Sequence, residues 1–395
     1  MTLVDPGAPL EDRLRVLEAH ARLNHLWAIH GIGALAALYG TPHGRTQTMG
    51  MDNGEVDRII AGIRGFLTGL PDDWLARWSR AGDEWDARAQ DVLDRGKHAT
   101  AAGHGLIASM CHHVGEMMVY SLGEVPGRRE AALRCAASFR KVGDYFDPPA
   151  HRLDVPFGDS TLPGYLRLPA GVERPPVAIL TGGANSVKEE LHPVTEFLVR
   201  RGIATVCFEA PGQGEYFATT DRPLRAESFV RAVSAVIDAL EADDRVDTGR
   251  LAVFGRATSG LLVIRAAAVD KRITAIVAHP GSYDWSTFFE RQFPFYPSQL
   301  ELFTVLGARS IAEGIELIRS EFTLVDHLAD VQAPMLIVNS LDDRAIPVSE
   351  AALLEERATC EVDVVRFPGR AHGGPPALAQ PLEADWLAER LRASV

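Results

Sequence analysis

The chain has 395 residues, which is more than one ordinary domain needs, and 46% of them are hydrophobic, enough for sizeable cores. Its formal charge is −13, and the sequence contains no cluster of Lys or Arg. Because nucleic acids and anionic membranes are bound through basic clusters, we do not expect either as a partner. No apolar run approaches the roughly 18 residues of a membrane span, and the first residues lack the pattern of a signal peptide. We therefore expect a cytoplasmic protein with two domains.

The first 150 residues show apolar side chains at helical spacing and no alternating strand pattern. An acidic Pro-Asp-Asp start at 71–73 suits the positive end of a helix that carries Trp74, Trp78 and Trp85. The predicted helices cover residues 9–23, 26–38, 56–66, 71–96, 104–122 and 127–146. Together they predict a helical domain over residues 1–148.

Two features of this helical part invite a metal interpretation. The Cys-His-His run at 111–113 offers three ligand types, but successive helical residues point about 100° apart and cannot converge on one ion. The four cysteines are scattered without a C-x-x-C spacing, which favours reduced thiols over a zinc site or a disulfide framework. We therefore predict no metal, and we interpret Met110, Met117 and Met118 as helix packing, with the floor of a pocket as the alternative.

From residue 151 the pattern changes to strands that alternate with helices. Residues 151–157 and 161–168 alternate in polarity around Gly158-Asp159 and predict a hairpin. Short, continuously apolar strands follow at 177–180, 203–208, 251–254, 273–278, 335–339 and 362–367. Such strands indicate a mostly parallel sheet covered on both faces, whose ligands bind at the carboxyl ends of the strands. The sequence thus predicts an α/β domain over residues 149–395.

One of these strands runs into a turn of small residues and then an apolar helix, at 251–266. In this context G-x-S-x-G forms the nucleophile elbow of α/β-hydrolases, where a strained turn presents a serine. Here Ala257 occupies the nucleophile position, and Ser259 stands where the second glycine is usual. Alanine has no nucleophilic atom. Ser259 lies two residues into the helix start, so its side chain is expected to point away from the apex of the turn.

Two further motifs follow strand ends in the order that these enzymes use, nucleophile, then acid, then histidine. Asp343 has Pro347 four residues on, which makes it the preferred acid, with Asp342 as the alternative. His372 lies on a Gly-rich loop, and a carboxylate can orient a histidine and stabilise its cation. Each motif alone is compatible with an ordinary surface turn, but the ordered combination predicts a catalytic pair.

The turn after the 177–180 strand contains Gly182, Gly183 and Ala184. Backbone N–H groups at Gly183 and Ala184, together with the N–H of Thr258, would form an oxyanion hole for a reacting carbonyl. An ordinary strand-to-helix turn is the alternative.

A family resemblance is carried by three segments, Gly-Gly-Ala-Asn-Ser-Val-Lys-Glu-Glu at 182–190, Pro-Gly-Gln-Gly-Glu at 211–215 and Phe-Gly-Arg at 254–256. They resemble α/β-hydrolases of the FrsA-like and 2,6-dihydropseudooxynicotine-hydrolase-like group, which includes fungal hydrolases that shorten polyketides. The resemblance covers residues 151–395 through motifs and the helical part through architecture only. It implies a helical cap on an α/β-hydrolase, no cofactor, and cleavage of esters or of carbon–carbon bonds in ketones and β-dicarbonyl compounds. The family elbow reads Gly-Arg-Ser-x-Gly-Gly, so this chain departs at Ala257 and Ser259.

The missing serine allows three interpretations. The one we favour is a nucleophile-deficient variant of a serine hydrolase, because the acid, the histidine and the Gly-Gly turn are all retained. The second is a non-hydrolytic lyase, cyclase or aldolase, in which His372 and Asp343 act as a base and the oxyanion hole steadies an enolate. The third is a binding protein without catalysis.

The aromatic segment at 282–296 bears on the substrate. Trp285 and Phe289 would wall an apolar pocket for an aromatic or polyketide-sized small molecule, and Glu290 would add a polar contact or a second acid. Packing in the core is an equally weighted alternative for the aromatic residues. By analogy with other large helical caps, a homodimer is left open.

Overall fold

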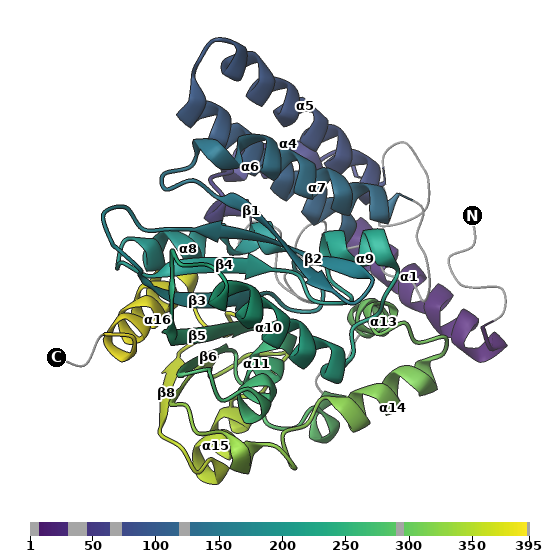
Figure 1. The fold of residues 1–395 in the computed structure, drawn as a ribbon. Helices are drawn as coiled ribbons and strands as arrows, with labels where there is room; N and C mark the ends of the chain where they lie inside the picture. Colours follow the sequence, from purple (N-terminus) through teal and green to yellow (C-terminus); the bar gives the residue numbers. More distant parts are fainter. Residues whose placement is uncertain (1–7, 31–45, 64–72, 118–126, 290–295, 393–395) are drawn as a thin grey trace. The chain divides into compact units, whose positions relative to one another are not determined.

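The computed structural model describes residues 8–30, 46–63, 73–117, 127–289 and 296–392 (Figure 1). The chain forms two compact units. The first comprises Met1–Pro149, Phe217–Pro223 and Phe293–Ile315, and the second Ala150–Tyr216, Leu224–Gln292 and Glu316–Val395. Two short segments from the later chain therefore join the N-terminal helices. The assignment of residues 1–148 as a cap and 149–395 as a catalytic domain stays a prediction.

The second unit is built on one sheet of eight strands in the order β1-β2-β4-β3-β5-β6-β7-β8. The strands are β1 (His151–Phe157), β2 (Ser160–Arg167), β3 (Pro176–Thr181), β4 (Ala204–Phe208), β5 (Asp247–Arg256), β6 (Ala275–His279), β7 (Met335–Ser340) and β8 (Val362–Phe367). β1 and β2 form the predicted hairpin, and β2 is antiparallel to β4. The remaining pairs are parallel, which confirms the predicted α/β-hydrolase fold class.

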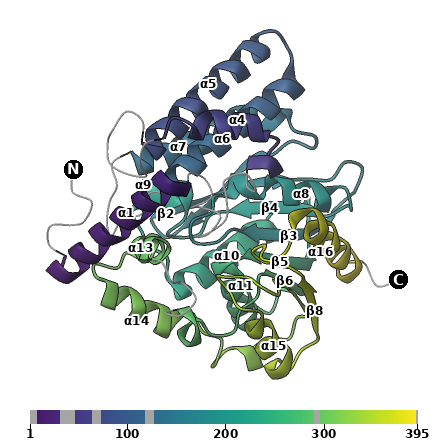
Figure 2. The ribbon, with the colours of Figure 1, turned by 180° about the vertical axis from the view of Figure 1, so that it is seen from behind.

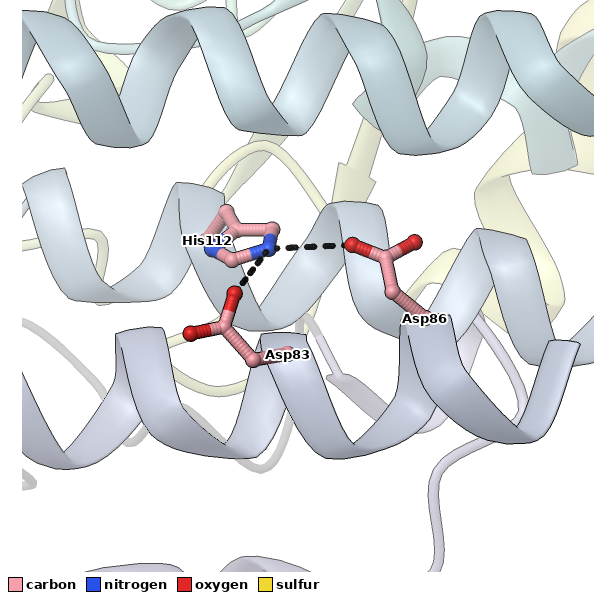
Figure 3. A group of neighbouring side chains, drawn as sticks. All are labelled: Asp83, Asp86 and His112. Atoms are coloured by element: carbon pink, nitrogen blue, oxygen red, sulfur yellow. Dashed lines mark hydrogen bonds and ion pairs between the residues drawn. The ribbon is translucent and has the colours of Figure 1, made fainter. Parts of the chain in front are cut away.

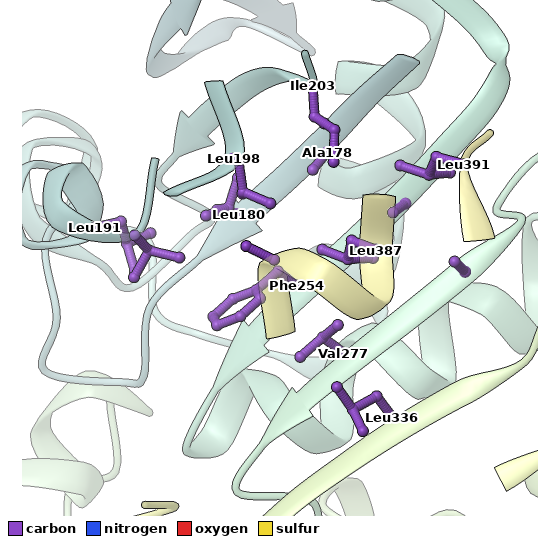
Figure 4. Close-up of a cluster of buried hydrophobic side chains, with 14 of the residues drawn as sticks. Ala178, Leu180, Leu191, Leu198, Ile203, Phe254, Val277, Leu336, Leu387 and Leu391 are labelled. Atoms are coloured by element: carbon purple, nitrogen blue, oxygen red, sulfur yellow. The ribbon is translucent and has the colours of Figure 1, made fainter. Parts of the chain in front are cut away.

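Helices cover both faces of this sheet. On one face, Leu180 and Phe254 pack against α8 (His192–Val199) and α16 (Pro376–Arg390), as Figure 4 shows for Leu198 and Leu387. The opposite face carries α10 (Ala226–Glu241) and α11 (Thr258–Val269) (Figures 1 and 2). β3 and β4 are buried along their whole length and are mostly apolar, the pattern that predicted a parallel sheet covered on both faces.

The connecting helices of this unit lie between the strands in chain order. They are α9 (Gly214–Thr220), α14 (Ile311–Glu321) and α15 (Val348–Arg357) in addition to the four above, and α9 and α14 extend into segments of the first unit. The parallel strands β3 to β8 therefore have their carboxyl ends at the same edge of the sheet, where the predicted site residues follow β3, β5, β7 and β8.

The first unit is helical. Its helices are α1 (Leu10–His30), α4 (Asn53–Ile60), α5 (Trp74–Asp94), α6 (His98–Met117), α7 (Arg128–Val142) and α13 (Tyr296–Val305). Trp74 and Trp78 are fully buried against Met110 and Met117, and the Trp74 indole N–H donates to the Val114 carbonyl at 2.8 Å. The packing role expected of Met110 and Met117 is confirmed, whereas Met118 lies outside the described residues.

Several helix boundaries differ from the sequence prediction by a few residues, and the differences at α1 and α6 have a clear physical reason. α1 continues through His30, so the expected break after residue 23 is wrong, because neither Gly nor Pro interrupts the chain there. α6 begins at His98, six residues early, since its alanine-rich first turns have no large apolar side chain to show the helical period. Within the described residues, no helix is both long and apolar enough to cross a membrane.

Candidate active site

The turn between β5 and α11 has the backbone of a nucleophile elbow. Ala257 has φ 51° and ψ −119°, a conformation that L-residues rarely adopt and that costs on the order of 1–3 kcal/mol. Its N–H donates to the carbonyl of His279 at the end of β6, at 2.9 Å. The strained turn is therefore held by the backbone of the neighbouring strand, without help from the side chain at position 257.

The two elbow glycines are required by close backbone approach. A Cβ on Gly255 would lie 2.2 Å from the Ser259 carbonyl oxygen, and one on Gly260 would lie 2.3 Å from the Pro280 carbonyl oxygen. Neither contact can relax by moving a flexible side chain. These positions therefore accept only glycine, as the elbow motif predicts.

Asp343 and His372 come together from the loops that follow β7 and β8. The His372 Nδ1 lies 2.9 Å from Asp343 Oδ2 and 3.2 Å from Oδ1. Asp343 is buried, whereas 43% of the His372 side chain is exposed. Asp342, the alternative acid, is exposed on the surface. The geometry thus selects Asp343 as the residue that orients the imidazole.

The Asp343 carboxylate is stabilised as an anion. Burial by itself would raise the pKa of Asp343, but the adjacent His372 ring outweighs it, and the N–H groups of Ala345 and Gly373 add to that effect. These backbone groups donate to the carboxylate at 2.9 and 3.1 Å. The pKa of Asp343 is consequently held below its usual value, which leaves a charged carboxylate facing the imidazole at neutral pH.

The loop after β3 lies directly against the elbow. A Cβ placed on Gly183 would lie 3.1 Å from the Ala257 Cβ and 3.9 Å from the Thr258 nitrogen. In the described part of the chain, the N–H groups of Gly183, Ala184 and Thr258 donate to no protein acceptor. Buried backbone N–H groups are nearly always paired, so three free donors beside one residue are an unusual concentration. This arrangement is what stabilisation of an oxyanion requires.

The Ser259 side chain is bonded to the loop after β3. It is buried, and its hydroxyl donates to the Gly182 carbonyl. Ser259 thereby ties the start of α11 to the loop that carries the N–H groups of Gly183 and Ala184, while its direction away from the apex of the elbow stays a prediction.

Comparison with known families supports the resemblance to FrsA-like hydrolases. Residues 51–284 match the model of the FrsA-like esterases, and residues 191–391 match that of the prolyl oligopeptidase family. The chain belongs to the FrsA-like esterase family. It is 24% identical over 277 residues to the 2,6-dihydropseudooxynicotine hydrolase of Paenarthrobacter nicotinovorans, covering 70% of this chain and 72% of that protein. It is 32% identical over 267 residues to hydrolase ORFZ of Pyricularia oryzae, covering 62% and 61%.

The FrsA-like fold is also seen in solved structures. The crystal structure of the 2,6-dihydroxy-pseudo-oxynicotine hydrolase superposes with a TM-score of 0.76 at 22% identity, over 88% of this chain and 95% of that one. This similarity shows the shared α/β-hydrolase fold with its N-terminal helices. With the fungal hydrolase the alignment spans about three fifths of the relative's length.

One part of this FrsA-like site was not foreseen from the sequence. The ring of His279 pairs through Nδ1 with Glu383 of α16, and its Nε2 lies 3.3 Å from the His372 carbonyl. Both His279 and Glu383 are buried. Because the His279 carbonyl also accepts the Ala257 N–H, one residue joins the elbow to the histidine loop. The sequence signal that could have indicated this role is a histidine at the end of a buried strand.

The Cys-His-His run at 111–113 diverges, as expected for successive helical residues. Cys111 lies in the apolar core, His113 faces Glu116, and His112 lies 3.4 Å from Asp86. Figure 3 shows His112 between Asp83 and Asp86, whose ligand atoms lie within 4.8 Å of one another.

Cationic and hydroxyl donors already occupy the two aspartates beside His112. Arg134 donates to Asp83 at 2.7 Å, and the Ser138 hydroxyl donates to Asp86 at 2.8 Å. The Asp83 oxygen that lies 4.0 Å from His112 Nε2 is the one that accepts from Arg134. We therefore interpret the group as an ion-pair cluster between helices.

The aromatic residues expected at the substrate site pack together. Trp285 is stacked on Phe289, with ring centroids 6.1 Å apart, and also contacts Phe322. Both Trp285 and Phe289 are buried, and the Trp285 indole N–H donates to the Ser282 hydroxyl. This geometry favours the packing alternative, and substrate contact stays a prediction. Glu290 lies outside the described residues.

Proposed function

We propose that this site is that of a serine-type hydrolase of ketone or ester carbonyls, in which position 257 lacks the nucleophilic oxygen. The observation that carries the proposal is the elbow itself, since Ala257 keeps a strained backbone beside three free N–H donors. A turn with no role in binding a carbonyl would relax this strain or use glycine. The Asp343–His372 pair supplies the base.

The chemistry follows from the roles of these groups. With a serine at position 257, His372 would take the hydroxyl proton while the oxygen attacks the carbonyl carbon, and Asp343 would stabilise the imidazolium. The N–H groups of Ala184 and Thr258 would hold the resulting oxyanion. Its collapse would break the ester or carbon–carbon bond, with His372 giving its proton to the leaving oxygen or carbon, and a water molecule activated by His372 would then hydrolyse the acyl-enzyme. With alanine the covalent step is absent, so the chain binds a carbonyl compound and turns it over negligibly.

The substrate class that we propose is an apolar small molecule with a ketone, β-dicarbonyl or ester group. It is supported by the family and by the name of one relative, a hydrolase of 2,6-dihydropseudooxynicotine. The second relative is also a hydrolase.

The test restores the missing atom. Loss of a serine nucleophile costs on the order of 10⁶ in turnover, so Ala257→Ser should raise hydrolysis of 4-nitrophenyl esters and β-diketones by several orders of magnitude. Ala257→Gly is the matched control, because it fits the elbow backbone and adds no oxygen. Hydrolysis by the parent chain or by Ala257→Gly at the rate of Ala257→Ser would contradict the proposal.

A second candidate is non-hydrolytic base chemistry, favoured by the fact that the Asp343–His372 pair is complete without any serine. His372 would then remove a proton next to a carbonyl, and the free N–H groups would steady the enolate. It predicts lyase, cyclase or aldol products from the chain with Ala257 in place, lost in His372→Ala. Mass spectrometry of β-dicarbonyl substrates incubated with the parent chain distinguishes the two candidates.

A further inference from the structure

Gln213, in the loop between β4 and α9, is buried and uses every hydrogen-bonding position of its amide. Its Nε2 donates to the carbonyls of Gly182 and Gly183 at 2.7 and 2.9 Å. Its Oε1 accepts from the Ala210 N–H at 2.9 Å and from the Thr181 hydroxyl at 3.3 Å. One side chain therefore fixes two successive carbonyls of the loop that faces Ala257.

The same two carbonyls have second donors. The Ser259 hydroxyl donates to the Gly182 carbonyl, and the Ser186 N–H donates to the Gly183 carbonyl at 3.1 Å. In a trans peptide the C=O and the following N–H point in opposite directions. Holding the carbonyls of Gly182 and Gly183 towards Gln213 thus turns the N–H groups of Gly183 and Ala184 away from it.

We propose that Gln213 and Ser259 are positioning residues that set the oxyanion hole before any substrate arrives. The inference rests on the proposed function, because it assigns the freed N–H groups of Gly183 and Ala184 to a carbonyl oxygen that becomes negatively charged. It also explains the departure at Ser259, whose hydroxyl ties the start of α11 to the same loop. Preorganised donors of this kind stabilise developing charge without reorganisation during the reaction.

Further contacts join the loop that carries Gln213, between β4 and α9, to the loop after β3. The Glu209 carboxylate accepts from the N–H of Lys188 at 3.1 Å and from the N–H of Tyr216 at 3.2 Å. The Lys188 ammonium group, fully buried, lies 2.8 Å from Glu215 and 2.7 Å from Glu189. These contacts tie residues 182–190 to residues 209–216, which supports a positioning role for Gln213.

The first experiment measures the loop in the parent chain, without relying on activity. Gln213→Met keeps the side-chain volume and removes both donors, and should accelerate amide hydrogen exchange of residues 182–187 at least about tenfold. Gln380→Met, at another buried glutamine in α16, is the control and should leave that exchange unchanged. Unchanged exchange in Gln213→Met would overturn the proposal.

The second experiment uses the Ala257→Ser background. Gln213→Met should lower kcat by about 10²–10³ with KM within about twofold, because lost oxyanion-hole donors act on the transition state. Ser259→Ala should lower kcat less, about tenfold, since Gln213 still holds the loop, and it replaces Gln213→Met if that variant does not fold. A change confined to KM would overturn the positioning role. If Ala257→Ser is folded but inactive while loop exchange still responds to Gln213→Met, the proposed function fails and the positioning of the loop stands.

Discussion

The elbow and the Asp343–His372 pair make an instructive comparison, because both follow the carboxyl ends of parallel strands and only the pair has polar side chains at the predicted catalytic positions. At the elbow the strained backbone persists around an alanine, held by the His279 carbonyl. At the acid–histidine pair, both side chains are present, and three backbone N–H groups donate to the carboxylate. The backbone of the elbow is therefore held by contacts that do not involve the side chain at position 257.

The largest expected effect on turnover comes from the Asp343–His372 pair. In the Ala257→Ser background, Asp343→Asn should lower turnover by about 10⁴, as in other Ser-His-Asp triads, because the imidazole loses its orienting anion. Asp342→Asn is the matched control, since that neighbouring carboxylate is exposed. Steady-state kinetics at saturating ester measures both. Equal losses of turnover in the two variants would show that Asp343 is not the acid that orients His372.

A smaller effect on turnover is expected at the His279–Glu383 pair, which joins the elbow to the loop of His372. Glu383→Gln should weaken the charged hydrogen bond to His279, and with it the contact of His279 with the His372 carbonyl. We expect about a tenfold loss of turnover in the Ala257→Ser background and about 2 kcal/mol less free energy of unfolding. Glu389→Gln, exposed on the same helix, should change neither quantity. Chemical denaturation with unchanged stability in Glu383→Gln would exclude the joining role.

The smallest effect on turnover is expected at Glu215, where a pH dependence of stability should appear instead. Burial alone would raise the pKa of Glu215, but Lys188 and Arg152 outweigh it and lower the pKa to about 2. A lowered pKa contributes stability above the usual value of 4.5, and this contribution is lost as the pH falls from 4.5 towards 2.

Urea unfolding between pH 7 and pH 2 tests this expectation. Glu215→Gln should lower the free energy of unfolding at pH 7 by about 3 kcal/mol and remove the part of the acid-dependent loss that Glu215 contributes. Glu173→Gln, at an exposed acid, should leave the parent pH profile in place. A parent profile retained in Glu215→Gln would contradict the assignment.

Local sequence patterns predicted much of this molecule. The apolar strands, the hairpin and the elbow depend on residues close together in the chain, and so does the choice of Asp343 with Pro347 after it. His279 and Glu383 escaped prediction because their partnership spans 104 residues and leaves no local period. Gln213 lies in the Pro-Gly-Gln-Gly-Glu segment at 211–215, but the carbonyls to which it donates lie 30 and 31 residues away, so its partners have no local signal. The joining of residues 217–223 to the helical unit likewise has no local signal.

The most direct test of the central claim is covalent labelling with a fluorophosphonate, followed by peptide mass spectrometry. We expect no label on the parent chain, one phosphonyl group at position 257 in Ala257→Ser, and loss of that label when His372→Ala is added, because the probe requires an activated oxygen at the elbow. A label on Ser259 of the parent chain would contradict the account. So would a folded Ala257→Ser variant that stays unlabelled, since the remaining machinery would then not be that of a serine hydrolase.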